Sequence, residues 1–277
     1  MKIAAVLLIG LLLTLTGAGA AETASARRTL QLGRQIYRDN CAVCHGVQGD
    51  GNGPAASMFR IQPRDFRTGT YKFRSTHADS LPTDDDLLRT VTQGVRGTAM
   101  IGRPDLGDNE RKAVIQYIKT FSPRFEKEKP GRSIAIAAAP GNTPQVLQQG
   151  KQLYIDAGCS SCHGTEGRGG GPSSTGLKDD WGRPIWPPNL TWRPLKRGSD
   201  TRETYLTLVT GLYGTPMPSY ADALNGQEIW ALVTYLESLV PPEHRLDPNQ
   251  LIGEEQQGWM TLRMGGMMGG GMMHRSR

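Results

Sequence analysis

GRQIYRDNCAVCHG, residues 33–46, returns in a similar form as GKQLYIDAGCSSCHG, residues 150–164. Each segment contains one C-x-x-C-H unit, a pattern typical of covalent haem attachment, in which the adjacent histidine supplies an axial nitrogen to the iron. His45 and His163 occupy that position. The chain has four cysteines, and all of them belong to these two units: Cys41, Cys44, Cys159 and Cys162.

Two other chemistries use closely spaced cysteines. A thioredoxin-like redox pair needs a βαβ context, and the sequence shows no such pattern. A structural zinc site takes four nitrogen or sulfur ligands, whereas each C-x-x-C-H unit supplies three. No cysteine is left over for a disulfide, an iron–sulfur cluster or a thiol nucleophile. The sequence therefore predicts two covalently bound haem c groups.

The repeat continues beyond the cysteines, which indicates a duplicated domain. LLRTVTQGVRGTAM (87–100) matches YLTLVTGLYGTPM (205–217). Each half then closes with an amphipathic helical pattern, over 109–121 and 226–239. We also expect helices over about 84–93 and 200–210, and few strands. Together these patterns predict a mainly α fold with two tandem domains, at 22–125 and 145–240.

The remaining segments have their own compositions. A charged and Ala-rich stretch with Pro at both ends predicts a linker over 126–144. The Gly/Met-rich tail, 241–277, is low in complexity and is expected to be flexible. Its methionines and His274 could bind Cu(I), although a tail without a ligand is the simpler hypothesis.

The N-terminus has the pattern of a secretory signal peptide over 1–20. Lys2 is followed by an apolar run over 3–15, and Ala18-Gly19-Ala20 forms a small-residue cleavage pattern. The alternative is an uncleaved membrane anchor, but the run is shorter than the roughly 20 apolar residues that a spanning helix needs. We expect cleavage near Ala20 and a periplasmic protein.

Both halves resemble class I cytochrome c domains, over about residues 28–121 and 145–240. The resemblance rests on Cys41-Ala42-Val43-Cys44-His45 with Met100, and on Cys159-Ser160-Ser161-Cys162-His163 with Met217. It implies that each domain is a small helical bundle around its haem. It also implies that the first helix crosses the last at a glycine and an aromatic residue: Gly33 and Tyr37 with Tyr117, and Gly150 and Tyr154 with Tyr235.

The resemblance also implies a set of iron ligands. His45 and His163 are the proximal ligands, and Met100 and Met217 lie opposite them, 55 and 54 residues farther along the chain. The family's proline offers its carbonyl to the histidine ring, a role that falls on Pro54 and Pro172. Rival ligands in the first domain are Met58 and His77, which we expect to be a packing residue and a solvated loop residue. His244, in the tail, is not expected to bind iron.

Histidine–methionine ligation fills both axial positions of an iron, so such a haem transfers electrons and has no site for a small substrate. We therefore expect a respiratory dihaem electron carrier, free or as a subunit of a larger complex, and not an enzyme. The alternative is a peroxidase-like dihaem enzyme with one catalytic haem. Expected partners are redox proteins, with peripheral association to a membrane-bound respiratory complex and no nucleic acid.

Charge is distributed unevenly between the two halves. The formal net charge is +5 over residues 22–131 and −1 over residues 145–240. A basic first domain could be steered to an acidic face of a partner. A merely solubilising surface explains the same numbers equally well.

Overall fold

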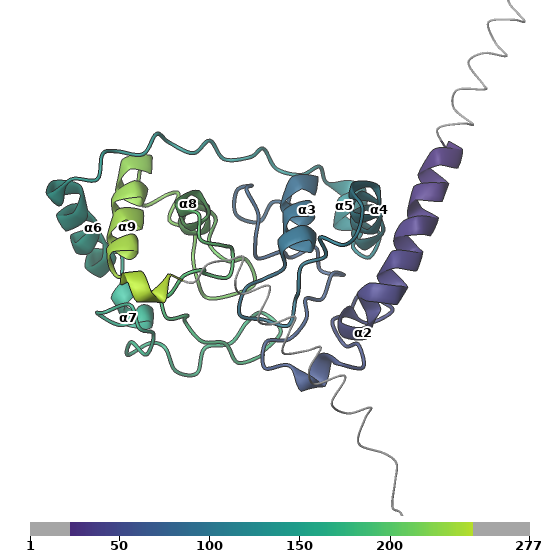
Figure 1. The fold of residues 1–277 in the computed structure, drawn as a ribbon, viewed down its shortest axis with the longest axis horizontal. Coiled ribbons are helices and arrows are strands. Elements are labelled where there is room, and N and C mark those ends of the chain that lie inside the picture. The colour runs from purple at the N-terminus through teal and green to yellow at the C-terminus, as the bar shows by residue number, and fades with distance from the viewer. Residues whose placement is uncertain (1–22, 246–277) are drawn as a thin grey trace, which may run out of the picture.

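The computed structural model describes residues 23–245, and over this range it contains helices, loops and isolated β-bridges but no β-strand. The helices form two groups that lie side by side, one from each half of the chain (Figure 1). The predicted mainly α fold with two tandem domains is confirmed. The signal peptide with its cleavage near Ala20, and the part of the expected tail from residue 246 on, with His274, lie outside the described residues. At the start of the expected flexible tail, residues 242–244 form a short 3-10 helix. Within 23–245, no helix is long and apolar enough to cross a membrane.

The two domains use similar elements in the same order. The first contains a helix over 23–40, then α2 (Ala42–His45), η1 (Ala56–Met58), α3 (Asp84–Gln93), α4 (Asp108–Lys119) and α5 (Arg124–Lys127). The second contains α6 (Pro144–Asp156), α7 (Cys159–His163), α8 (Thr201–Thr210), α9 (Gly226–Ser238) and η2 (Pro242–His244). The helices expected from the sequence before and after each Met-containing loop are present as α3, α4, α8 and α9.

Capping residues explain where several of these helices begin. Thr83 Oγ1 accepts a bond from the Asp86 amide at 3.1 Å, and Asp86 Oδ2 accepts one from the Thr83 amide at 2.9 Å. Asn225 and Glu228 form the same reciprocal pair at the start of α9. Such capping boxes satisfy amide groups that have no partner inside the helix. The caps fix the residues at which α3 and α9 begin. Because α3 precedes the first Met-containing loop and α9 follows the second, both helices help to position these loops.

In each domain the first helix crosses the last long helix, α4 or α9, at a glycine. A β-carbon added at Gly33 would lie 2.1 Å from the Ala113 carbonyl oxygen, and one added at Gly150 would lie 1.9 Å from that of Ala231. Only a glycine allows such a close approach of two backbones. A tyrosine one turn later packs on the opposing helix, with ring centroids 5.4 Å apart for Tyr37–Tyr117 and 5.3 Å for Tyr154–Tyr235. The crossings have the form that the resemblance implied.

Each domain has its own apolar core. The first gathers Ile36, Tyr37, Phe66 and Leu87 with Val114, Ile115 and Ile118 of α4. The second is centred on α9, whose Ile229, Leu232 and Val233 are at most 2% exposed. Cys41 and Cys159, the first cysteines of the two motifs, contact these cores. The motif helices are therefore anchored on the apolar interior of their domains.

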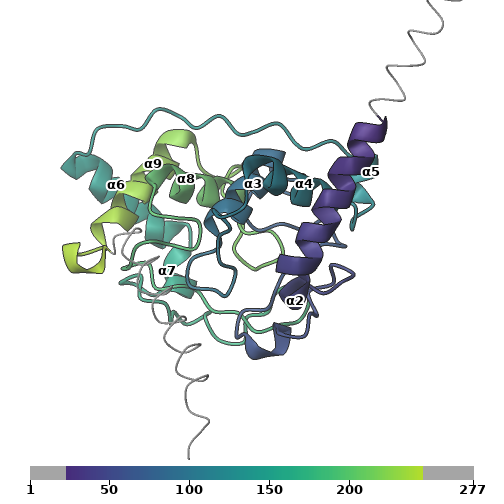
Figure 2. The same cartoon turned by 45° about the vertical axis from the view of Figure 1, so that its right-hand side comes forward.

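The segment between the domains runs along both of them (Figures 1 and 2). On the first domain, the Ile134 amide donates to the Ser75 carbonyl at 2.7 Å. On the second, the Trp230 indole donates to the Ala137 carbonyl at 2.7 Å, and Ile134, Ile136 and Ala137 pack against the second core. The expected linker is thus an extended strap with partners on each side.

Arginine side chains join the two domains directly. Arg74, 1% exposed, donates from Nη2 to the Thr210 carbonyl at 2.9 Å, and its own carbonyl accepts Arg197 Nη1 at 2.9 Å. Arg89 of α3 forms an ion pair of 3.0 Å with Glu203 of α8. Hydrogen bonds to charged groups are among the stronger ones in proteins, so these contacts hold the domains in one arrangement.

Candidate functional site

The C-x-x-C-H units fold as the short helices α2 and α7. A spacing of three and four residues places both cysteines and the histidine on one side of a helical turn. Gly46 and Gly164, both with φ of +76°, end these helices, a conformation that glycine adopts without strain. Among the described residues all four cysteines are free of disulfides, so their thiols are available for covalent attachment of a porphyrin.

A backbone carbonyl orients each histidine of the two motifs. His45 Nδ1 lies 3.0 Å from the Arg64 carbonyl oxygen, and His163 Nδ1 lies 3.3 Å from that of Pro188. Because a carbonyl can only accept, Nδ1 carries the proton and Nε2 keeps its lone pair for a metal. Burial lowers the pKa of both histidines, which favours the neutral, ligating form.

The expectation that Pro54 and Pro172 supply these carbonyls was wrong. The segments that contain these prolines fold back on the motif helices instead. The amides of Gly53 and Gly171, one residue before each proline, donate at 3.1 Å to the carbonyls of Cys44 and Cys162. Those carbonyls belong to the last turn of the helix, where no partner inside the helix exists. Contact of either proline with haem stays a prediction.

The loops that carry Met100 and Met217 have the same internal hydrogen bonds. Thr98 Oγ1 donates to the Val95 carbonyl at 2.8 Å and accepts from the Met100 amide at 3.1 Å. Thr215 Oγ1 repeats this with Leu212 and Met217, at 2.7 and 3.3 Å. The amides of Val95 and Leu212 also donate hydrogen bonds to the carbonyls of Met100 and Met217, at 2.8 and 3.1 Å, and these bonds close each loop.

This pattern constrains the backbone at both methionines. The Met217 side chain is partly buried against the second core. Each loop is therefore a rigid turn that presents one thioether. Ligation of iron by Met100, Met217, His45 and His163 remains a prediction that this geometry favours.

The rival ligands lie on the surface. The Met58 side chain is 79% exposed, so the expectation that it is a packing residue was wrong. His77 is exposed, as expected for a solvated loop residue. His244 stacks on Trp192 with ring centroids 3.9 Å apart, and its Nδ1 lies 3.0 Å from the Thr191 carbonyl. These positions give no reason to replace Met100 or Met217 as candidate ligands.

Two buried polar atoms of the first domain indicate space for a group with acceptor oxygens. Arg64 Nη1 and the Tyr71 hydroxyl have no hydrogen-bond partner among the described residues. Buried donors are almost always paired in folded proteins, and the carboxylates of a haem supply such acceptors. With four free thiols, two oriented imidazoles and two Met loops, the residues present fit two covalently bound haems.

Arg64, Phe66 and Pro188 were not predicted from the sequence as parts of the site. The Phe66 ring stacks on the His45 imidazole with centroids 4.5 Å apart. Arg64 and Pro188 act through their carbonyls, so their side chains carry no signal for this role. The matched segments QPRDF (62–66) and WPPNL (186–190) could have pointed to them, since Pro63 and Pro187 precede both acceptors.

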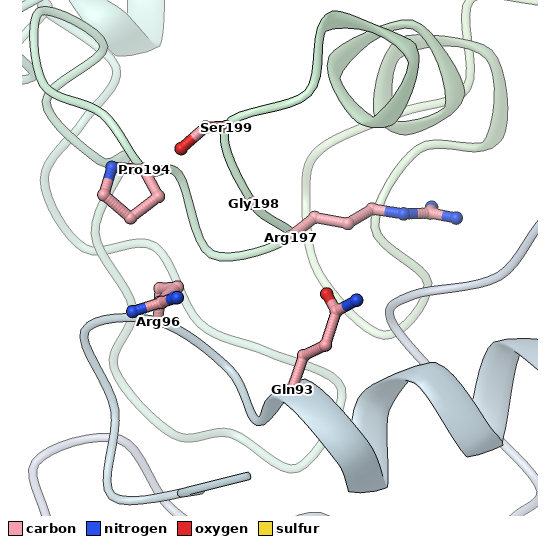
Figure 3. Close-up of a pocket in the computed structure, with 6 residues that line it drawn as sticks. All are labelled: Gln93, Arg96, Pro194, Arg197, Gly198 and Ser199. Atoms are coloured by element: carbon pink, nitrogen blue, oxygen red, sulfur yellow. The ribbon is translucent and has the colours of Figure 1, made fainter. Parts of the chain in front are cut away.

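A cavity of about 270 Å³ lies where the first Met loop faces the second domain (Figure 3). Gln93 and Arg96 line it from the first domain, and Pro194 with the turn over 197–199 lines it from the second. The Arg197 guanidinium bonds instead to the Arg74 carbonyl and to Glu203. The cavity is thus a gap in the domain interface, slightly smaller than a typical small-molecule site.

Comparisons with known proteins agree with this geometry. The family model described as Cytochrome c matches twice, at residues 30–122 and 147–240. A chain of the Kuenenia stuttgartiensis reducing HAO-like protein complex is 40% identical in sequence, with a TM-score of 0.74. The similarity covers 76% of this chain and 96% of that one.

Curated relatives include subunits of cbb3-type cytochrome c oxidases. FixP of Azorhizobium caulinodans is 26% identical over 75% of this chain, and CcoP of Azospirillum brasilense is 28% identical over 75%. CcoP of Helicobacter pylori strain 26695 is 23% identical over 52%. The matched regions span 58%, 61% and 40% of the lengths of these relatives, so the relatives contain further sequence that this chain does not match.

Proposed function

Because the chain belongs to the cytochrome c family, with a covalently bound haem c in each of its two domains, we propose that it is a periplasmic dihaem electron carrier. Its redox centres are two haems ligated by His45 with Met100 and by His163 with Met217. The observation that carries this proposal is the equivalence of the two Met loops, which share the hydrogen bonds of the threonine hydroxyl and of the methionine amide and carbonyl.

Bound haem iron supplies one-electron chemistry between its ferric and ferrous states. The residues of this chain determine how that chemistry is used. The carbonyls of Arg64 and Pro188 hold each imidazole with Nε2 directed away from the backbone. The threonine-braced loops would supply a thioether as a second ligand. With an imidazole and a thioether both bound to iron, neither haem would have a free position for a small substrate, which favours electron transfer over catalysis.

The comparisons support a role in a larger assembly. Relatives named as subunits of an oxidase and a similar chain in an HAO-like complex suggest that this protein exchanges electrons with protein partners at a respiratory complex. The basic first domain suits an acidic partner face. The leader expected over 1–20 accounts for delivery to the periplasm.

Electron paramagnetic resonance of the oxidised protein tests this proposal, together with the near-infrared methionine band measured per haem. We expect two low-spin irons and a band intensity that accounts for two methionine ligands. A high-spin iron, or a missing methionine band in one domain, would contradict the proposal and favour the peroxidase-like alternative.

A further inference from the structure

Basic side chains from both domains meet near His45. We define the interdomain cation cluster as Arg64 and Lys72 of the first domain with Arg183 and Lys196 of the second. The Arg64 guanidinium lies over the Trp181 ring of the second domain, 4.3 Å from its centroid. Arg183 Nη1 reaches back to the Pro63 carbonyl at 3.2 Å. The cluster therefore spans the interface and includes Arg64, whose carbonyl orients the candidate ligand His45.

Asp179 and Asp180 lie near the cluster, but neither forms an ion pair with its side chains among the described residues. Neither Lys72 nor Lys196 forms an ion pair or hydrogen bond through its ammonium group over residues 23–245, and Arg64 Nη1 is buried without a partner. Of these acids, Asp179 accepts the backbone amides of Trp181 and Arg183 with its Oδ1, at 3.0 and 2.9 Å. Uncompensated charges at partly buried positions are costly, so the arrangement calls for an anion.

The electrostatic environment agrees with this need. Burial, with Arg64 and Lys196 close by, lowers the pKa of Lys72 to about 8. Burial also lowers the pKa of Lys196, and that of Arg64 to about 10. A carboxylate between these groups would remove the penalty, since an opposite charge favours the protonated lysines.

We propose that a propionate of the first-domain haem occupies the interdomain cation cluster, where Arg64 Nη1 and the Tyr71 hydroxyl donate hydrogen bonds to it. Lys72 and, from the second domain, Lys196 supply the opposite charge. Arg64 is placed for this role because its carbonyl holds the His45 ring while its side chain faces the second domain. Burial raises the pKa of the Tyr71 hydroxyl, which keeps its proton for donation.

One consequence is that the second domain tunes the haem of the first. A positive charge beside a propionate stabilises the reduced haem, which carries one positive charge less than the oxidised haem. Lys196 then raises the midpoint potential of a haem that is bound to the other domain. The inference rests on the proposed function in taking His45 as an iron ligand, and its test also uses Met100 and Met217 as ligands to assign the two potentials.

Lys196→Gln tests the contribution of the second domain by spectroelectrochemical titration of the intact protein. Met100→Ala and Met217→Ala, titrated in parallel, assign the two potentials to the two haems. We expect Lys196→Gln to lower the first-domain potential and Lys196→Arg to restore it. Lys151→Gln, which removes the same charge from an exposed position of α6, should leave it unchanged. A shift no larger than that of Lys151→Gln, or a shift of the second-domain haem alone, would overturn the inference.

Tyr71→Phe provides an independent test, because it removes one hydroxyl and keeps the packing. If the Tyr71 hydroxyl has no partner in the haem-loaded protein, the substitution should leave the potential unchanged. If the hydroxyl donates to a propionate, the substitution should lower the first-domain potential and leave both methionine bands intact. An unchanged potential contradicts the inference and leaves the proposed function standing. Missing methionine bands in the unaltered protein would instead contradict the proposed function.

Discussion

Tyr37 and Tyr154 show how single residues are reused in the two domains. Each phenol donates a hydrogen bond of 2.7 Å to the carbonyl of the glycine that follows its C-x-x-C-H unit, Gly46 or Gly164. Each ring also packs on the last helix of its domain. In each domain, one tyrosine therefore connects the helix crossing to the C-terminal end of the haem-binding motif, directly after the histidine.

Tyr37→Phe should destabilise the protein through the carbonyl it leaves behind. Loss of one partner from a buried hydrogen bond costs about 1–3 kcal/mol, and Gly46 is buried. We expect a lower free energy of unfolding in denaturant titrations of the haem-loaded protein. Tyr117→Phe is the matched control, since that hydroxyl forms no hydrogen bond with residues 23–245. An equal loss in both variants would show that packing, not the hydrogen bond, is responsible.

Met217→Ala should lower the midpoint potential of the second-domain haem, because a thioether ligand favours the ferrous state. Redox titration followed by optical absorption measures this, and the near-infrared methionine band should decrease by the share of one haem. Met58→Ala, at a side chain that is 79% exposed, should change neither quantity. If the potential stays the same in Met217→Ala, Met217 is not the ligand.

At the scale of elements, the first helix of each domain is held close to α4 or α9 by the crossing at a glycine. The contacts at Gly33 and Gly150 are backbone to backbone, so neither side can yield by rotating a side chain. The capping residues of α3 and α9 then place the Met loops relative to that crossing. α4 and α9 therefore take part both in the crossing and in positioning the Met loops.

Gly33→Ala should loosen the crossing of the helix over 23–40 with α4. The added carbon would overlap the Ala113 carbonyl, and overpacking of this kind costs about 1–3 kcal/mol or more. We expect a lower denaturation midpoint and a lower yield of the first-domain haem in the pyridine haemochrome assay. Gly141→Ala, whose nearest neighbour would be 3.9 Å away, should behave like the unaltered protein. Normal stability of Gly33→Ala would argue against a tight crossing.

Local signals in the sequence explain which elements could be predicted. The helix expected over 84–93 is observed over the same residues, because Thr83 and Asp86 mark its start and Gly94 its end. The acceptors at Arg64 and Pro188 could not be predicted in this way, since any residue can offer a carbonyl. Arg74, which is fully buried, was also missed, because arginine usually lies on the surface and its partners come from a different domain.

At the scale of the whole molecule, each Met loop contacts the opposite domain. The Arg96 amide in the first loop donates to the Lys196 carbonyl at 3.2 Å. Gly214 in the second loop lies so close to Arg64, Thr70 and Trp181 that an added β-carbon would be 3.1–3.2 Å from each. The interface thus joins the segments that carry the candidate ligands, and the arginine contacts around it hold both haem domains as one unit.

Arg74→Ala should weaken this unit. Each hydrogen bond from a charged group contributes about 1.5–3 kcal/mol, and Arg74 donates to the carbonyls of Tyr71, His77 and Thr210. We expect the thermal transition to move to lower temperature and to split into two steps, followed by calorimetry. Arg168→Ala, which removes an exposed ion pair with Glu166, should cost less than about 1 kcal/mol. A single transition at the original temperature would mean that the interface adds little stability.

The extended segment between the domains, residues 128–143, determines where the chain can be divided into two halves. The recurring sequence of the second half begins near Gly150, but the interior of that half also needs Ile134, Ile136 and Ala137, which precede it. A fragment that began at Pro144 would leave the Trp230 indole without its acceptor and open an apolar face of α9 to water. The unit that is repeated in the chain is therefore shorter than the unit that packs around the second core, and a dissection of the two halves should cut before Ser133.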